Sequence, residues 1–445
     1  MLEQRGSMVV SESMTRIPLP AVLPIEPASR PIRGQARPPG SKSYTNRALL
    51  LAGLARGTST LEGALFSDDT LHMARGLEAL GLRVVVDEEG ERFEVEGGAG
   101  AFPASTATVF VGNSGTTARF LAPAMALGRG VFALDGNEAM QKRPLQPLLD
   151  ALTALGGRAT SLRGNGCPPI RVEASGLDGG AVRMPGGVSS QYFSALLMVA
   201  PCTRRGVTID VDGDLVSKPY LDVTAQAMAA FGGRLDRDAS YRHFDVRPAP
   251  YTATRYVVEP DASAASYFFA AAAVTGGRVL VPGLGSRSLQ GDLGFVRVLE
   301  RMGCEVRQTA TETEVTGPPA LSGIEIDMSN LSDTAQTLGA IAPFAKGPTR
   351  VTGIGFIRRK ETDRVGAVVA ELKRLGVRAE EEDDGFVVYP GVPQPGDVET
   401  YDDHRMAMSF AVTGLAAPGI RIRNPACVSK TFPEFFTVLD RLRNA

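Results

Sequence analysis

Short motifs that combine lysine, arginine and hydroxyl side chains recur along this chain, and this combination suits the binding of anions. The first, G-S-K-S-Y-T-N-R at residues 40–47, places Lys42, Ser43 and Arg47 at the start of a predicted helix. Because the first N–H groups of a helix lack partners within it, both cations can face an anion together with free backbone donors. The spacing is not that of a Walker P-loop. For this motif alone, a capped helix with solvated cations is an alternative.

Four similar motifs follow before residue 260. G-N-S-G-T-T-A-R at 112–119 is a glycine-rich strand-to-helix turn, which alone is a weak signal because such turns are often structural. K-R-P at 142–144 is predicted to open a helix with proline at its first position, so that Arg143 points outward. S-S-Q at 189–191 and S-K-P-Y at 217–220 suit a hydroxylated, phosphorylated ligand, although each could be an ordinary helix cap.

The groups that could transfer protons stand in the second half of the chain. Asp333 lies in S-D-T (332–334), Glu361 in K-E-T-D-R (360–364) and His404 in D-D-H-R-M-A-M (402–408). Lys430, in S-K-T-F-P (429–433), adds a cation at the last helix start. Singly, Asp333 could be a helix cap, and Glu361 could form a surface ion pair with Arg364. Their equivalent positions in a sequence repeat favour one shared site.

The elements that carry these motifs repeat along the chain. Glycines before apolar, strand-like segments recur about every 72 residues, at Gly57, Gly130, Gly206, Gly277, Gly347 and Gly419. An apolar segment before each glycine predicts a buried helix, at residues 43–54, 116–127, 190–199, 262–274, 333–344 and 403–415. A second, amphipathic helix is predicted to begin near Asp69, Pro144, Pro219, Asp292, Thr362 and Phe432. The polar motifs fall at these helix starts.

The repeat predicts an α/β fold with two domains of three units each, since 445 residues exceed one ordinary core. We expect a first lobe at 39–258 and a second at 259–445, which residues 17–38 complete because the sixth unit lacks a strand pair. The chain would then cross between lobes near 38–40 and 258–261, and such a hinge suggests closure over a ligand. Residues 1–16 are predicted to form a flexible tail.

The composition limits the classes of partner. Lysine and arginine total 47 against 49 aspartate and glutamate, so no basic field favours nucleic acid or membrane surfaces. The four cysteines are far apart and the three histidines form no Cys/His pair, which predicts reduced thiols, a cytoplasmic location and no zinc site. No apolar run reaches membrane-spanning length. We expect a monomer, because two lobes of one chain complete the site.

The ordered set of motifs, from G-S-K-S-Y-T-N-R to S-K-T-F-P, resembles that of the 5-enolpyruvylshikimate-3-phosphate (EPSP) synthase family. The resemblance extends from about residue 20 to the C-terminus. It implies a two-domain inside-out α/β barrel and a transferase of the shikimate pathway, which leads to chorismate and the aromatic amino acids. Such an enzyme transfers the enolpyruvyl group of phosphoenolpyruvate to the 5-hydroxyl of shikimate 3-phosphate through a tetrahedral intermediate and releases phosphate, without a metal or organic cofactor.

The resemblance also implies site residues. Those for shikimate 3-phosphate are Lys42, Ser43, Arg47, Ser189, Ser190, Gln191, Ser217, Tyr220, Asp333 and Lys360. Those for phosphoenolpyruvate are Lys42, Asn113, Gly115, Thr116, Arg143, Gln191, Arg364, His404, Arg405 and Lys430. Asp333 is the candidate base for the 5-hydroxyl, and Glu361 the candidate proton donor to the methylene carbon. Lys42 could stabilise developing charge, and His404 could assist orientation or proton transfer.

Two details qualify this resemblance. Relatives often have a polar residue four positions before Lys360, whereas this chain has Phe356, so one contact to shikimate 3-phosphate is in doubt. Gly115 implies sensitivity to glyphosate, the family's inhibitor, which occupies the place of phosphoenolpyruvate. The alternatives are UDP-N-acetylglucosamine enolpyruvyl transferase, which typically carries a reactive cysteine in a cleft loop, and a non-catalytic binder of phosphorylated metabolites.

Overall fold

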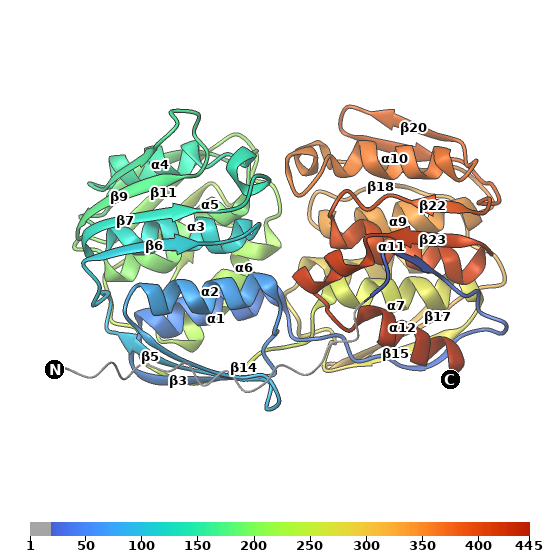
Figure 1. Cartoon of the computed structure of the whole chain (residues 1–445), viewed down its shortest axis with the longest axis horizontal. Coiled ribbons are helices and arrows are strands. Elements are labelled where there is room, and N and C mark those ends of the chain that lie inside the picture. Colours follow the sequence, from blue (N-terminus) through green and yellow to red (C-terminus); the bar gives the residue numbers. More distant parts are fainter. Residues whose placement is uncertain (1–18) are drawn as a thin grey trace.

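The computed structural model describes residues 19–445, and the tail predicted at residues 1–16 lies outside this part of the chain. Figure 1 shows two halves side by side along the long axis of the molecule. The chain from lighter blue to green forms one half, and the yellow to red part, with the dark blue segment from the start of the described chain, forms the other. In each half, buried helices, surface helices and small sheets recur in the predicted order.

Six helices of the described chain are buried on nearly all faces, because small and apolar residues surround their axes. They are α1 (Lys42–Leu54), α3 (Gly115–Ala126), α5 (Ser190–Val199), α7 (Ala262–Thr275), α9 (Ala335–Ile341) and α11 (His404–Ala416). The fifth is shorter than the predicted run 333–344. The 3-10 turns η4 (Ser332–Thr334) and η5 (Ala342–Phe344) flank it, and Pro343 in η5 has no N–H to continue the helix.

A second set of helices presents one face to the core and the other to solvent. These are α2 (Asp68–Ala79), α4 (Gln146–Ala154), α6 (Pro219–Ala230), α8 (Phe295–Arg301), α10 (Arg364–Arg374) and α12 (Phe435–Asn444). The prediction that Pro144 opens a helix is wrong: α4 begins at Gln146, with Pro147 in its first turn. Arg143 follows the short 3-10 helix η1 (Met140–Lys142) and has an extended backbone, so it projects from a loop.

Six small sheets flank the helices in the part of the chain from residue 19 onward. In the first half, the strand order of the first sheet is β14 (Arg255–Val257), β3 (Arg56–Glu62), β5 (Arg92–Gly98), β4 (Arg83–Asp87). That of the second is β6 (Thr106–Phe110), β7 (Arg129–Asp135), β9 (Ile170–Ser175), β8 (Arg158–Ser161). That of the third is β10 (Gly180–Pro185), β11 (Val207–Asp212), β13 (His243–Val246), β12 (Asp236–Arg237). In the second half, the strand order of the first sheet is β2 (Arg33–Gln35), β15 (Arg278–Pro282), β17 (Glu312–Thr316), β16 (Glu305–Gln308). That of the second is β18 (Glu325–Asp327), β19 (Thr349–Thr352), β21 (Gly385–Val388), β20 (Ala379–Glu382). The third has three strands, in the order β22 (Gly396–Val398), β23 (Ile420–Arg423), β1 (Val22–Pro24).

Segments from the start of the described chain share sheets with strands of the second half. Strand β2 pairs in parallel with β15, and β1 pairs antiparallel with β23. Two chain connections run side by side between the halves: the Ser41 N–H donates to the Glu259 carbonyl at 2.8 Å, and the Asp261 N–H donates to the Pro39 carbonyl at 2.9 Å. The link between the halves is therefore a short, hydrogen-bonded pair of chain segments, with an isolated antiparallel bridge between Gly40 and Pro260.

The apolar core is divided in the same way. One core comprises buried residues between Tyr44 and Val258, and the other comprises Ile25, Ile32 and Ala36 with residues between Ala262 and Leu442. Helices α7, α9 and α11 contact one another inside the second core, while strands such as β9 alternate buried and exposed residues. Helices inside and sheets outside confirm the predicted inside-out α/β fold. Between residues 19 and 445 no helix has the length and apolar character to cross a bilayer.

Candidate active site

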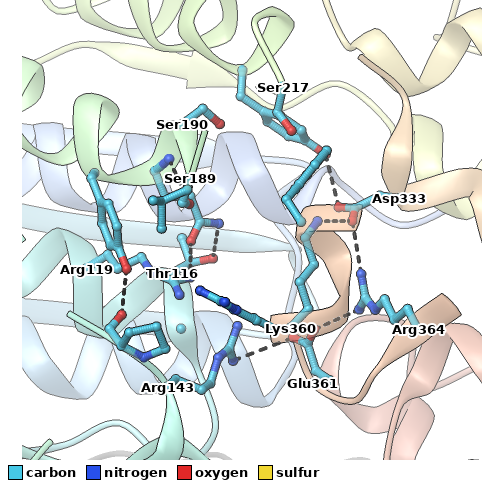
Figure 2. A pocket seen from close by; sticks show the side chains of 18 of the residues that line it. Thr116, Arg119, Arg143, Ser189, Ser190, Ser217, Asp333, Lys360, Glu361 and Arg364 are labelled. Atoms are coloured by element: carbon cyan, nitrogen blue, oxygen red, sulfur yellow. Dashed lines mark hydrogen bonds and ion pairs between the residues drawn. The ribbon is translucent and has the colours of Figure 1, made fainter. Parts of the chain in front are cut away.

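A cavity of about 360 Å³ lies between the two halves (Figure 2). Helix starts line it from both sides: α1, α3, α5 and α6 from the first half, and α10 and α11 from the second. Free N–H groups and the positive end of the helix dipole at each start favour an anion. Seven lysine and arginine side chains and three carboxylates line this cavity, so its charge also favours anionic ligands.

Asp333 lies at the centre of the cation cluster from the second half. Its Oδ1 accepts from Lys360 Nζ at 2.6 Å and from Arg364 Nη1 at 3.0 Å. Its Oδ2 accepts from Arg405 Nη2 at 2.9 Å and from the Tyr220 hydroxyl, which belongs to the first half, at 3.2 Å. Burial alone would raise the pKa of Asp333, but Arg405, Lys360 and Arg364 outweigh burial and hold the pKa well below its usual range. The carboxylate is ionised and can accept a proton.

Glu361 faces cations from both halves. Its Oε2 accepts from Arg364 Nη2 at 2.8 Å, and its Oε1 lies 3.0 Å from Lys430 Nζ and 3.7 Å from Arg143 Nη1. The side chain is 8 % exposed, so the surface ion pair considered for Glu361 and Arg364 is in fact buried. Burial would raise the pKa of Glu361, yet Lys430, Arg364 and Arg143 hold it well below the usual range. Figure 2 shows Arg143 pointing across the cavity toward Glu361.

On the first half, Gln191 connects two helix starts. Its Oε1 accepts from Arg119 Nη1 at 2.7 Å, and its Nε2 donates to Thr116 Oγ1 at 3.1 Å. The Ser189 hydroxyl caps α5 by accepting from the Gln191 N–H. Lys42 pairs with Asp69 at 3.4 Å. These contacts fix donors and acceptors along the wall that Ser43, Ser190 and Ser217 complete.

The halves touch each other beside the cavity. Lys430 Nζ donates to the Asn113 carbonyl at 2.9 Å, and Ser429 Oγ donates to Asp68 Oδ2 at 2.6 Å. Arg143 Nη1 donates to the same Asn113 carbonyl at 3.1 Å. Because these contacts join η7 (Pro425–Lys430) to the first half, the cavity is enclosed from this side.

Most of the predicted site residues line this one cavity. They are Lys42, Ser43, Gly115, Thr116, Arg143, Ser189, Ser190, Gln191, Ser217, Tyr220, Asp333, Lys360, Glu361, Arg364 and Arg405. The other four, Arg47, Asn113, His404 and Lys430, do not line it. Asn113 and Lys430 lie next to the lining, in the contacts just described.

Arg47 lies behind the cavity wall and is 1 % exposed. Its guanidinium donates to the Ser43 carbonyl at 2.9 Å, to Thr224 Oγ1 at 2.8 Å and to the Tyr220 carbonyl at 3.2 Å. Burial lowers its pKa to about 10, which leaves it charged at neutral pH. In this arrangement Arg47 fixes the backbone under two lining residues.

His404 is the first residue of α11 and is 1 % exposed. Neither ring nitrogen has a hydrogen-bond partner among the described residues. Burial, then the charges of Arg405 and Lys42, lower its pKa well below the usual value for histidine. The imidazole is therefore neutral at neutral pH, so it can orient a ligand or accept a hydrogen bond but holds no proton to give as an imidazolium.

Sequence reasoning did not assign several lining residues, including Asp69, Arg119 and Arg359. Asp69 stands at a predicted helix start and Arg119 ends the motif at 112–119, so position in the repeat was the available signal. Phe356 also lines the cavity, with Lys360 Nζ 5.8 Å from its ring centroid. Its ring thus meets the lysine through a cation–π contact where a polar group was expected. Within residues 19–445 no cluster of three or more His, Cys, Asp or Glu side chains could hold a metal ion.

Comparison with known proteins points to one family. The family model "EPSP synthase (3-phosphoshikimate 1-carboxyvinyltransferase)" matches residues 27–439. A 3-phosphoshikimate 1-carboxyvinyltransferase from Nostoc punctiforme is 47% identical over 426 residues, which cover 95% of this chain and 98% of the relative. One from Shewanella denitrificans is 44% identical over 415 residues, with 92% and 96% coverage.

Solved structures share the fold at lower identity. The EPSP synthase from Acinetobacter baumannii matches with a TM-score of 0.80 at 24% identity, over 95% of this chain and 98% of that one. The enolpyruvyl transferase NikO from Streptomyces tendae matches with a TM-score of 0.76 at 20% identity, over 95% and 97%. The family match covers more than nine tenths of the chain, and the two relatives match over 95% and 92% of it. The chain belongs to the EPSP synthase family.

Proposed function

We propose that this chain transfers the enolpyruvyl group of phosphoenolpyruvate to the 5-hydroxyl of shikimate 3-phosphate and releases phosphate, as a 3-phosphoshikimate 1-carboxyvinyltransferase. One observation carries this proposal: two carboxylates, Asp333 and Glu361, face a cavity that lysine and arginine side chains line from both halves. The cations suit two phosphorylated, carboxylated substrates, and the carboxylates supply the proton transfers that joining them requires.

Shikimate 3-phosphate lies against the first half in this proposal. Ser189, Ser190 and Gln191 offer hydroxyl, amide and N–H donors at the start of α5, and Ser217 and the Tyr220 side chain line the cavity at the start of α6. Ser43 and Lys42 complete this side, and Lys360 reaches over from the second half. Arg47 supports this subsite from behind instead of forming a wall of it. Phe356 presents its ring to the Lys360 ammonium, which donates to Asp333 at 2.6 Å.

Phosphoenolpyruvate lies between the halves in this proposal, against Gly115, Thr116 and Arg143 on one side and Arg364 and Arg405 on the other. The remaining contacts come from Lys42, Gln191, Asn113, Lys430 and His404. A small trianion buried at such a site needs several opposite charges, because desolvation of its charge is costly.

Asp333 removes the proton from the 5-hydroxyl while the oxygen forms a bond to C2 of phosphoenolpyruvate, and Glu361 gives a proton to the C3 methylene, which becomes a methyl group. The Glu361 carboxylate then takes a proton back from this methyl group, which restores the double bond as the C2–O bond to phosphate breaks. The bound substrate also alters Glu361: an anion that draws Lys430 and Arg143 to itself weakens the charges that hold the Glu361 pKa low. Substrate binding thus prepares the proton donor.

The alternatives have less support. All four cysteines lie in the described part of the chain, and none of them lines the cavity. Burial raises the pKa of Cys167, and it raises those of Cys202, Cys304 and Cys427 to about 12, so none is activated as a thiolate. This counts against UDP-N-acetylglucosamine enolpyruvyl transfer. A non-catalytic binder has no need for Asp333 and Glu361 to face the same bound anions.

We further propose that residues 39–258 and residues 17–38 with 259–445 act as two domains that close over the substrates. The paired connections at Gly40 and Pro260 would serve as the hinge. Support comes from the two separate apolar cores and from the contacts of Lys430 and Tyr220 between halves. A monomer in the cytoplasm, without nucleic-acid or membrane partners, is part of this proposal.

Phosphate release tests the proposal. We expect the purified protein to release phosphate only when both substrates are present, and to lose this activity in Glu361→Gln but keep it in Glu300→Gln, a surface control in the second half. Release of phosphate from phosphoenolpyruvate alone, release with UDP-N-acetylglucosamine as the acceptor, or no release at all would each contradict the proposed function.

A further inference from the structure

Asp292 is a buried carboxylate that does not line the cavity but contacts Tyr220, which does. It lies in η3 (Gly291–Gly294), is 4 % exposed, and reaches Tyr220 across the boundary between the halves. Its Oδ2 accepts from the Tyr220 hydroxyl at 3.1 Å and from the Ser263 hydroxyl. Its Oδ1 has no hydrogen-bond partner among the described residues. A buried carboxylate so poorly satisfied calls for an explanation.

The same Tyr220 hydroxyl also reaches Asp333 Oδ2 at 3.2 Å. A phenol has one proton, so it can donate to only one of these carboxylates at a time. Asp333 already has three cationic partners, whereas Asp292 Oδ2 has only the Ser263 hydroxyl besides Tyr220. The phenolic proton therefore favours Asp292. Asp333 Oδ2 then keeps Arg405 as its donor and retains a lone pair for the substrate's proton.

Charge acts in the same direction as hydrogen bonding. The groups that face Asp292 are Tyr220 from α6, Asp333 from η4, Arg405 from α11 and Asp261 at the start of α7. Burial and the charge of Asp333 raise the pKa of Asp292 to about 6, although Arg405 lowers it. Coupling between two sites is reciprocal, so an ionised Asp292 raises the proton affinity of Asp333 by the same free energy. The three cations otherwise make Asp333 a weak base.

We infer that Asp292 is a positioning residue for the transferase reaction: it draws the Tyr220 hydroxyl away from Asp333 and, through its negative charge, strengthens Asp333 as the acceptor of the substrate's hydroxyl proton. The inference rests on the proposed function and deepens it. Gly291 permits the contact between Asp292 and Tyr220. A Cβ at Gly291 would lie 2.7 Å from Cγ of Pro219, and Pro219 immediately precedes Tyr220. The close backbone approach holds η3 against the start of α6.

The test compares the pH dependence of kcat/KM for shikimate 3-phosphate between wild type and Asp292→Asn, because this profile reports ionisations of the free enzyme and the substrate's own phosphate, with a pKa of about 6, titrates equally in both measurements. Wild-type kcat/KM should rise as the pH increases through about 6, where Asp292 ionises. In Asp292→Asn the amide oxygen still accepts from Ser263 and Tyr220 but has no charge. This variant should lose that ionisation and about tenfold in kcat at pH 7.5, with little change in KM. Asp292→Ala should in addition raise KM, because Tyr220 loses its anchor.

Glu371→Gln is a matched control. Glu371 is also fully buried, accepts the Tyr401 hydroxyl at 2.6 Å, and does not line the cavity. Its substitution should leave the pH profile unchanged. An Asp292→Asn enzyme with the wild-type rate and profile would overturn the inference while leaving the proposed function intact. If the wild-type protein has no transferase activity, the proposed function fails. Infrared titration then still tests the ionisation of Asp292. Its protonated carboxyl band should vanish as the pH rises above about 6, and the band should be missing in Asp292→Asn.

Discussion

Gly115 lies at the start of α3, where the first half presents free N–H groups to the cavity. A methyl group at this position would lie 2.6 Å from Cζ and Nη2 of Arg143 and 2.8 Å from Nη1. Such contacts are too short to persist, so the Arg143 guanidinium must move away from the Asn113 carbonyl. In Gly115→Ala we therefore expect phosphoenolpyruvate to lose one charge-assisted contact.

The loss of such a contact costs about 1.5–3 kcal/mol, which corresponds to a rise of about 10- to 150-fold in the Michaelis constant for phosphoenolpyruvate. Glyphosate, being slightly longer than the substrate, should meet the methyl group itself as well as the displaced arginine. Its inhibition constant should rise at least about tenfold more than the Michaelis constant. The ratio of the two constants is thus the informative quantity.

Steady-state phosphate release with varied phosphoenolpyruvate and glyphosate measures both constants. Gly187→Ala is the matched control, because Gly187 lines the same cavity and a Cβ built there meets nothing within 4 Å. That variant should resemble the wild type. Equal rises in both constants for Gly115→Ala would refute the reasoning, as would a wild-type enzyme that is insensitive to millimolar glyphosate.

Three further predictions follow from the same geometry. Asp333→Asn and Glu361→Gln should each lose about two or more powers of ten in kcat, with a much smaller loss in shikimate 3-phosphate binding by calorimetry; near-normal rates in both would remove the acid–base assignment. As the pH rises from 4 to 7, the unfolding free energy of Asp292→Asn should increase by up to about 3 kcal/mol relative to that of the wild type. The reason is that native wild-type protein keeps the Asp292 proton up to about pH 6, whereas its unfolded chain has already released it. A difference in unfolding free energy that does not change with pH would contradict this. Shikimate 3-phosphate should reduce the radius of gyration in solution scattering, and an unchanged radius at saturation would contradict closure.

The repeat made the fold predictable. Each unit contains a buried helix, a glycine at a strand start and a second helix, and these local signals agree with one another six times. The start of α4 was not predictable in this way, because Pro144 and Pro147 both follow Arg143 closely and either could open a helix. The contact between Leu145 N–H and the Gly166 carbonyl, which lies outside the local sequence, accompanies the later start.

The candidate site was predictable as a set of residue types but not in its electrostatics. The sequence places Arg47 beside Lys42, yet contacts with Thr224 and Ser194, distant along the chain, turn its guanidinium away from the cavity. Glu361 has the spacing of a surface ion pair, yet Lys430 of the second half and Arg143 of the first also reach it, and its side chain is 8 % exposed. In the sequence, Asp292 marks only the start of a predicted helix. Its proposed role depends on the hydrogen bond from Tyr220, which lies 72 residues earlier in the chain.

The central claim is that one molecule of phosphoenolpyruvate is joined to one of shikimate 3-phosphate for each phosphate released. Nuclear magnetic resonance of carbon-labelled phosphoenolpyruvate mixed with shikimate 3-phosphate and the purified protein measures this directly. We predict that the label moves into an enolpyruvyl ether in equal amount to the phosphate formed. Label that appears in pyruvate, or that stays in phosphoenolpyruvate while the wild-type protein binds both substrates, would contradict the account.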